Sequence, residues 1–154
     1  MKIQRFYRVS IIAFLSLFLA ACQSTGSGQN EENVSFEDTY WQLEIMEGKT
    51  IVADERNRMI NLTLAAAEQR VSGYSGCNRL SGGYKLDGSR IEFLPFMSTK
   101  MACPWNDNLE MSFFNALAKV DAYNVEGSKM NLLDKEGEIV MSFVAAKPSI
   151  GKDY

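Results

Sequence analysis

Apolar and polar residues alternate along several short stretches of the chain. Ile60, Leu62 and Leu64 occupy every second position of one stretch, and residues 41–45 alternate in the same way. A period of two is typical of strands that bury one face. The same pattern predicts further strands over residues 70–74, 82–86, 90–93, 122–125, 129–133 and 139–144. Short loops that contain glycine join most of these strands, which predicts antiparallel pairing between neighbours.

One stretch in the C-terminal half breaks this pattern. Leu109, Phe113, Leu117 and Val120 recur at intervals of four, four and three residues. That spacing places them on one face of a helix, which we expect over residues 106–120. The predicted fold class is therefore mainly β (α+β): a small antiparallel curved sheet or half-barrel of about eight strands, with one helix packed on one end.

The first 22 residues have a different character. Three basic residues precede an apolar stretch that runs from residue 9 to residue 21. About 13 apolar residues are too few to span a bilayer comfortably as a helix, and they fit a secretory signal peptide better than a buried core helix. The stretch ends in LAAC, whose cysteine is Cys22; this resembles the bacterial lipobox, in which the cysteine receives a diacylglycerol and the chain is cleaved before it. We therefore expect a lipoprotein signal peptide over residues 1–21 and lipidation of Cys22.

The sequence after the apolar stretch predicts how the folded domain is attached to a membrane and which membrane carries it. Residues 22–35 combine the lipidated cysteine with Ser, Gly, Gln, Asn and Glu, a composition typical of a flexible tether. The folded domain is expected over residues 36–145, with a polar tail over residues 146–154. Gln23 stands where an aspartate would favour retention in the inner membrane. We therefore expect a protein of the bacterial cell envelope, anchored by lipid to the outer membrane and facing the periplasm.

The charge and the amino-acid composition of the chain argue against several classes of function. The chain has 16 basic and 19 acidic side chains, and loss of the three basic residues in the signal peptide changes the net charge from −3 to −6 (13 against 19). An acidic domain repels phosphate backbones, so we expect no nucleic-acid partner. The absence of histidine from the sequence excludes Ser-His-Asp and Cys-His catalysis and His-ligated zinc. The expectation is a protein that is not an enzyme and holds no metal or cofactor.

Two cysteines remain once Cys22 carries lipid. Cys77 and Cys103 would then lie in an oxidising compartment, where an even pair favours a disulfide. Two buried free thiols are one alternative. A reactive thiol is the other, because Arg79 and Lys100 are near in sequence and a basic neighbour could activate it.

Two motifs are dense in glycine, cysteine and polar residues. Residues 73–84 read GYSGCNRLSGGY and residues 98–104 read STKMACP. Together with WQL at residues 41–43 and Glu110 in the predicted helix, they resemble the META/HslJ family, in which W-x-L, G-x-x-G-C-N-x-x-x-G-x-Y, T-x-M-A-C and a helical Glu follow in this order. The resemblance implies a small antiparallel β-barrel or half-barrel with a helix, similar to that of secretin pilotins. It also implies an envelope lipoprotein linked to heat shock or novobiocin resistance, and it supplies no catalytic residues.

The motifs allow a structural and a functional interpretation. In the structural one, the glycines shape turns and the two cysteines fix the glycine-rich loop to the segment before the helix. In the functional one, a recognition site at one end of the barrel consists of Asn78, Arg79, Thr99 and Lys100. Acidic side chains are scattered over predicted turns and the helix start, and each is expected to be solvated: Asp54, Glu55, Asp87, Asp107 and Glu110.

The features together predict a non-enzymatic envelope lipoprotein that acts as a binding or scaffolding module. The family resemblance implies that it acts in envelope or heat stress and in novobiocin-type tolerance. Its expected partners are the membrane, through the lipid anchor, and an envelope protein or lipid whose identity the sequence does not specify. The alternative is a carrier or pilotin-like chaperone that binds a lipid chain or apolar peptide in the half-barrel. Bulky side chains could instead close the interior, and the candidates are Phe93, Phe113, Phe114 and Phe143.

Overall fold

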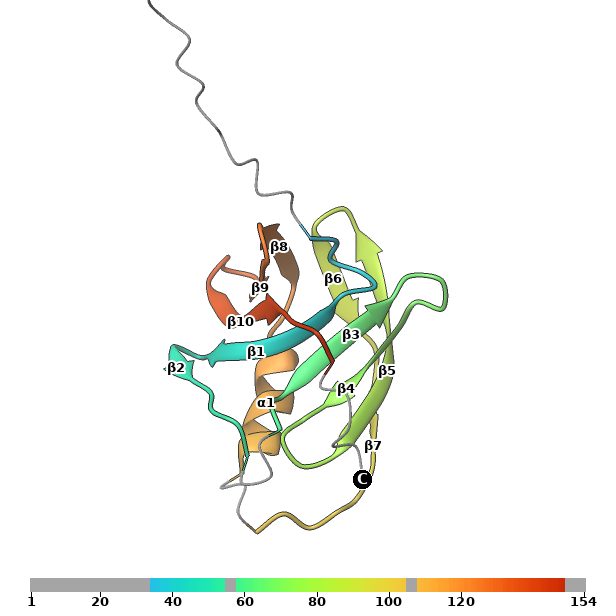
Figure 1. Cartoon of the computed structure of the whole chain (residues 1–154). Helices are drawn as coiled ribbons and strands as arrows, with labels where there is room; N and C mark the ends of the chain where they lie inside the picture. Colours follow the sequence, from blue (N-terminus) through green and yellow to red (C-terminus); the bar gives the residue numbers. More distant parts are fainter. Residues whose placement is uncertain (1–33, 55–57, 105–107, 149–154) are drawn as a thin grey trace, which may run out of the picture. The chain divides into compact units, whose positions relative to one another are not determined.

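The structure is a computed structural model that describes residues 34–54, 58–104 and 108–148. This part of the chain consists of short strands and a single helix (Figure 1). The strands and the helix are, in order, β1 (Tyr40–Met46), β2 (Lys49–Thr50), β3 (Asn61–Ala65), β4 (Arg70–Tyr74), β5 (Arg79–Asp87), β6 (Arg90–Phe93), β7 (Met97–Ser98), α1 (Leu109–Leu117), β8 (Ala122–Glu126), β9 (Lys129–Leu133) and β10 (Ile139–Ala145).

The strands form an antiparallel barrel. The order of hydrogen-bonded neighbours is β1-β3-β4-β5-β6-β8-β9-β10, and β10 pairs with β1 to close the ring. The two shortest strands lie outside this ring, since β2 pairs with β1 and β7 pairs with β5. The predicted mainly β fold is therefore confirmed, and the sheet closes into an eight-stranded barrel rather than remaining an open half-barrel.

The ring is closed unevenly. Strands β1 and β10 pair along most of their length, from Trp41 opposite Ala145 to Met46 opposite Met141. Strands β6 and β8 share one residue pair, Arg90 with Ala122. Backbone hydrogen bonds of 2.9 Å on either side of this pair complete the contact. The β6–β8 seam is thus the part of the ring with the fewest backbone bonds.

Alternate strand residues, together with Ile60 before β3 and Phe113 of α1, fill the barrel. Their side chains are less than 2% exposed, and the largest are Trp41, Tyr84, Phe113, Phe143, Leu43, Ile60, Leu62, Leu64, Met130, Leu132, Met141 and Val71. Of the four phenylalanines considered as interior fillers, Phe113 and Phe143 are fully buried, while Phe93 and Phe114 are half-buried. Burial of this apolar surface is the main driving force for the fold.

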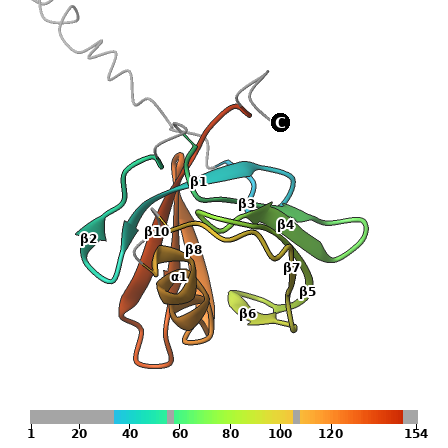
Figure 2. The same cartoon turned by 90° about the horizontal axis from the view of Figure 1, so that it is seen from below.

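Helix α1 lies at one opening of the barrel, as Figure 2 shows from that end. The helix presents Phe113 and Leu117 to the core, and they are 0% and 3% exposed. It is shorter than the predicted 106–120, because Val120 follows the last helical turn and residues 106 and 107 lie outside the described residues. No helix among the described residues is long and apolar enough to cross a bilayer.

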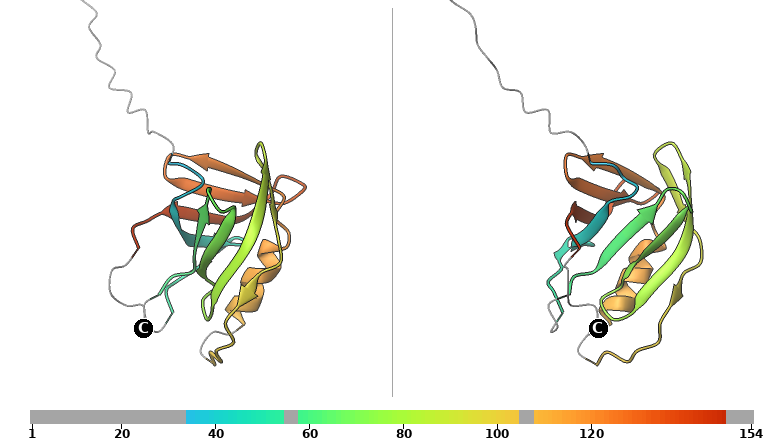
Figure 3. Two further views of the ribbon diagram at one scale, coloured as in Figure 1. Left: turned by 90° about the vertical axis from the view of Figure 1, so that its right-hand side faces the viewer. Right: turned by 45° about the vertical axis from the view of Figure 1, so that its right-hand side comes forward.

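The same end of the barrel collects the two sequence motifs. Strands β4 and β5 are joined by a short loop, and the segment after β7 leads back toward α1 (Figure 3). Hydrogen bonds connect the β4–β5 loop both to the segment after β7 and to the first turn of the helix. Residues far apart in sequence therefore meet at this end, and the candidate site is built there.

Candidate functional site

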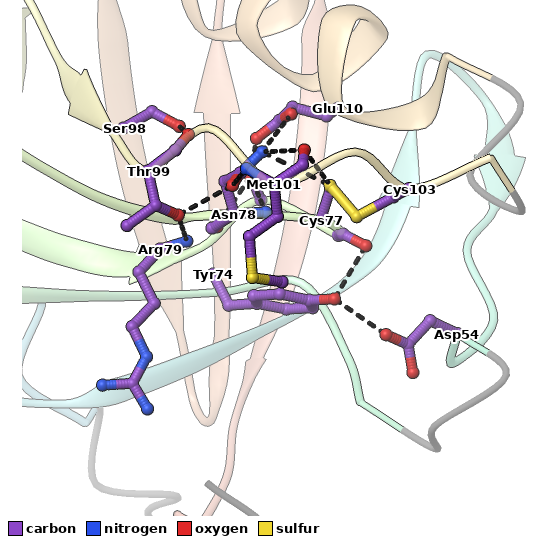
Figure 4. The surroundings of a disulfide bond; sticks show 12 residues. Asp54, Tyr74, Cys77, Asn78, Arg79, Ser98, Thr99, Met101, Cys103 and Glu110 are labelled. Carbon is purple, nitrogen blue, oxygen red and sulfur yellow. Dashed lines mark hydrogen bonds between the residues drawn. A yellow bond between two sulfur atoms is a disulfide. The ribbon is translucent and has the colours of Figure 1, made fainter. Parts of the chain in front are cut away.

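Asn78 is the centre of a polar cluster beside the disulfide (Figure 4). It is 4% exposed, and its Oδ1 accepts hydrogen bonds of 2.7 Å from the Thr99 hydroxyl and from the Met101 backbone N–H. Its Nδ2 donates to Oε2 of Glu110 at 2.9 Å and to the carbonyl oxygen of Met101 at 3.3 Å. The carboxamide thus uses both donors and both lone pairs, the full capacity of the group.

Glu110 and Ser75 extend this cluster. The fully buried Ser75 hydroxyl donates to the Glu110 carboxylate, and the Asn78 backbone N–H donates to Ser75 Oγ at 3.2 Å. Glu110 belongs to the first turn of α1, where a negative charge interacts favourably with the helix dipole. We call the cluster the brace, and it consists of Ser75, Asn78, Thr99, the Met101 backbone and Glu110.

A disulfide lies beside the brace. Cys77 and Cys103 are bonded, with 5.8 Å between their Cα atoms, which confirms the predicted disulfide and leaves neither sulfur as a thiolate nucleophile. The bond joins the β4–β5 loop to the segment before the helix. Both the brace and the disulfide fix the same two segments, so the geometry agrees with the structural interpretation of the two motifs.

The expectation that the acidic residues are all solvated is wrong for two of them. Glu110 is half-buried in the brace, and the Asp54 side chain is only 6% exposed. Asp54 accepts a 2.8 Å hydrogen bond from the Arg58 backbone N–H, and its own backbone N–H donates to the Arg58 carbonyl oxygen at 2.9 Å. Asp87 is exposed as predicted, whereas Glu55 and Asp107 lie outside the described residues.

The four predicted recognition residues do not form one surface. Asn78 and the Thr99 hydroxyl bond each other within the brace. Arg79 and Lys100 are exposed, and Figure 4 shows the Arg79 side chain pointing away from the brace. Recognition through these residues stays a prediction, and the geometry separates two that bond internally from two that face solvent.

A polar groove of about 440 Å³ lies on the outer face of β1, β3 and β4. Strand pairing explains its floor, because residues that pair across neighbouring strands point to the same face. One row across the strands is Gln42, Asn61, Tyr74 and Arg79, and the adjacent row is Tyr40, Thr63 and Ser72. The groove also contacts Arg58 and Met59 from the loop before β3, and Lys147 and Pro148 after β10.

Arg58 is held in place at the edge of this groove. Its guanidinium lies 4.1 Å from the centroid of the Tyr74 ring, and its Nη2 donates to the Tyr74 hydroxyl at 2.8 Å. Its Nε is 3.7 Å from Oδ2 of Asp54. Burial, and then the hydrogen bond to Asp54, raise the pKa of Tyr74, so this hydroxyl stays protonated at neutral pH. Sequence reasoning did not single out Arg58 or Tyr74, because the outer-face partners of a strand depend on register.

Comparisons with known proteins agree with this architecture. A protein from Burkholderia xenovorans with an NMR structure is 29% identical, with a TM-score of 0.57 over 73% of this chain and 84% of that one. A second protein with an NMR structure is 19% identical (TM-score 0.54, 70% and 88%), and a DUF4847 family protein from Bacteroides vulgatus is 15% identical (TM-score 0.52, 74% and 96%). These last two support the fold alone. The search of curated proteins found no match.

The family assignment rests on the sequence itself. The META domain matches residues 34–147, which include both cysteine-containing motifs, the helix and every strand described above. The predicted family resemblance is thereby confirmed. This small bacterial β-barrel domain belongs to the META domain family.

Proposed function

We propose that this chain is a lipid-anchored, non-enzymatic binding module of the bacterial envelope, and that it acts through the outer surface of its barrel. The filled interior is the observation that carries the proposal. Bulky side chains such as Trp41, Phe113 and Phe143 are 0% exposed where a carrier would need space for a lipid chain. A barrel of this size holds either side chains or one small ligand, so the packed core supports binding on the outside.

The anchor is inferred from sequence. Cys22 lies outside the described residues, and its lipidation is supported by the basic start, the short apolar stretch and the LAAC sequence. Two or more acyl chains hold a protein at a membrane far more firmly than one. A tether between the cysteine and the barrel would let the domain contact envelope components near the membrane surface.

The non-enzymatic part of the proposal is supported by the chemistry of the side chains. The sequence has no histidine, and Cys77 and Cys103 are bonded to each other. Among the described residues, no three His, Cys, Asp or Glu side chains are grouped so that they could hold a metal ion. The Asn78 carboxamide at the centre of the brace uses its hydrogen-bonding capacity internally rather than on a substrate.

Mass spectrometry of the full chain, produced in a bacterial envelope and purified in detergent, tests the proposal. Under denaturing conditions, the mass should show loss of residues 1–21 and addition of lipid to Cys22. The Cys22→Ser variant is the control and should keep the longer, unlipidated chain. Native and denatured masses of the lipidated protein should then be equal, because no cargo occupies the barrel.

Three results would contradict the proposal. An unprocessed wild-type chain would contradict the anchor. A native mass larger than the denatured mass by one lipid or peptide would instead support the carrier function. Turnover of a defined substrate that disappears in a point variant of the barrel would make the protein an enzyme.

For the physiological setting that the family resemblance implies, a deletion strain should be more sensitive to heat or novobiocin, and the wild-type gene should restore tolerance where the Cys22→Ser gene does not.

A further inference from the structure

We propose that the outer groove of β1, β3 and β4 binds an anionic saccharide, with its phosphate or carboxylate group between Arg79 and Lys147 and its hydroxyl groups on the polar floor. This inference deepens the proposed function by naming a surface and a ligand class. It depends on binding by the outer face but not on the lipid anchor, so the two can fail separately.

The positive charge of the groove is the first argument for an anionic ligand. Among the described residues, those that line the groove include three cations, Arg58, Arg79 and Lys147, and no carboxylate. The chain as a whole has a net charge of −3. A concave surface that gathers one sign of charge concentrates ligands of the opposite sign. The groove therefore has a polarity opposite to that of the protein that carries it.

The three cations differ in how their charge is used. Arg58 is balanced by Asp54, whose Oδ2 lies 3.7 Å from its Nε, and is held against Tyr74. In the described parts of the chain, neither the Arg79 guanidinium nor the Lys147 ammonium has a hydrogen-bond or ion-pair partner. The uncompensated positive charge of the groove consequently comes from Arg79 and Lys147, which extend from β5 and from the segment after β10.

Two described acidic residues near the groove, Asp54 and Asp38, already accept hydrogen bonds. Asp54 accepts a hydrogen bond from the Arg58 backbone and lies 2.7 Å from the Tyr74 hydroxyl. Asp38 lines a hollow that adjoins the groove at Tyr40 and Lys147, and its Oδ1 accepts a 3.2 Å hydrogen bond from the Ala66 backbone N–H. Neither carboxylate lines the groove itself, so an incoming anion would meet cations first.

The floor is the second argument, because it fits a saccharide better than an acidic peptide. Thr63 and Ser72 supply hydroxyl groups, and Gln42 and Asn61 supply carboxamides, all on the outer face of three adjacent strands. Such groups both donate and accept hydrogen bonds, as sugar hydroxyls do. An extended peptide would instead be recognised by an open strand edge, and the strands beneath the groove are paired on both sides.

The volume of the groove also matches this ligand class. About 440 Å³ lies within the range of sites that hold small molecules and is enough for one or two sugar rings. The anionic saccharide has two possible sources, a soluble sugar phosphate or uronate and the phosphorylated headgroup of a membrane glycolipid. Both present the same chemistry to the groove, and the experiment separates them.

Titration calorimetry of the full chain in detergent, at low salt, tests the assignment with glucose 1-phosphate, glucuronate, glucose and inorganic phosphate. The two anionic sugars should bind, glucose should not, and binding should weaken in about 0.5 M salt. Arg79→Ala and Lys147→Ala should each weaken binding about fivefold, the typical size of one exposed charge-assisted contact. Thr63→Val should weaken sugar phosphate binding but leave inorganic phosphate binding unchanged.

Lys135→Ala is the matched control. It removes the same charge from an exposed residue that does not line the groove, and it should leave the affinity unchanged. Equal losses in Lys135→Ala and Arg79→Ala would overturn the proposal, because binding would then follow net charge. Binding of glucose as tight as that of glucose 1-phosphate, or tighter binding of hexaglutamate than of any sugar, would overturn it as well.

The source of the saccharide is decided by vesicles. If the ligand is a headgroup, vesicles that contain a phosphorylated glucosamine glycolipid should retain the wild-type protein more strongly than the Arg79→Ala variant. Vesicles of neutral phospholipid serve as the comparison. Equal retention together with binding of the free sugar phosphate assigns the groove to a soluble ligand. No binding of any anionic sugar, free or in vesicles, would overturn the inference while leaving the lipid anchor and the filled barrel as they are.

Discussion

The brace and the groove are both polar clusters on the same barrel, but they use their polar groups differently. In the brace, the Asn78 carboxamide bonds Thr99, Met101 and Glu110 and keeps no capacity for another molecule. In the groove, neither the Arg79 guanidinium nor the Lys147 ammonium has a hydrogen-bond or ion-pair partner among the described residues. The contrast teaches that a dense, sequence-distinctive motif can serve stability, while the surface that we propose for binding consists of ordinary strand residues.

Tyr74 connects the two regions. Its hydroxyl accepts a hydrogen bond from Arg58 at the groove and lies 2.8 Å from the Gly76 carbonyl oxygen in the loop that carries the brace. Its ring supports the Arg58 guanidinium. A change in Tyr74 should therefore affect both regions, whereas changes on either side of it should affect one.

Removal of the disulfide should have the largest effect on stability and little on the groove. A bond that closes a loop of about 27 residues contributes about 3.5 kcal/mol in the chain-entropy description. Cys77→Ala with Cys103→Ala should lower the free energy of unfolding by about that amount, measured by urea denaturation. Reduced wild-type protein is the control and should match the variant. Unchanged stability with the fold intact would show that the brace alone holds these segments.

A matched pair of asparagine variants tests the comparison directly. Asn78→Ala removes the hydrogen bonds of the Asn78 side chain to Glu110, to the Thr99 hydroxyl and to the Met101 backbone N–H, and should cost about 3 kcal/mol. Asn61→Ala removes a groove residue whose carboxamide donates to the Met59 carbonyl oxygen at 3.0 Å, and should cost less than about 1 kcal/mol. Similar losses in both variants, measured by urea denaturation, would remove the distinction between the regions.

The alkaline stability limit should depend on Tyr74. Burial and the hydrogen bond to Asp54 raise its pKa above the usual value of 10.0, so the folded state holds the proton more tightly than the unfolded chain. This contribution to stability is complete below pH 10 and is lost as the pH rises toward the higher pKa of the folded state. Burial and the Glu37 carboxylate raise the pKa of Tyr84 in the same direction.

Melting temperatures of wild type, Tyr74→Phe and Tyr84→Phe between pH 8 and 12 measure this effect. The wild type should lose stability most steeply above pH 10, and each Phe variant should show a shallower loss because one ionisation is absent. Parallel curves for all three proteins would assign the alkaline loss to other groups, such as lysine. Only Tyr74→Phe should also alter the groove, since Arg58 would lose its hydrogen-bond partner.

The sequence predicted the strands well and the helix ends less well. Alternation identified β3 and β4 because one face of each is buried, as Leu62, Leu64 and Val71 show. The periodic apolar residues identified α1, but Val120 lies beyond its end. Such a pattern shows which face of a helix is buried and does not show where the helix stops. Closure of the barrel depends on the pairing of β10 with β1, a long-range contact that no local pattern encodes.

The candidate site was predictable only in part. The two cysteines suggested their own bond, because few free thiols persist in an oxidising compartment. Glu110 was expected to be solvated, and its engagement with Ser75 and Asn78 depends on the approach of a loop 32 residues away. Its place in the family motif was the available signal. No sequence motif indicated the groove, because the residues of its floor come together only through the register of three paired strands.

The smallest expected effect concerns the stability of groove variants. The Arg79 side chain is exposed and points away from the brace, and Lys147 lies after the last strand. Arg79→Ala and Lys147→Ala should therefore change the free energy of unfolding by less than about 0.5 kcal/mol, as surface substitutions usually do. A loss of more than about 2 kcal/mol, measured by urea denaturation, would mean that these cations support the fold. A weaker affinity in the same variants could then no longer be assigned to lost ligand contacts.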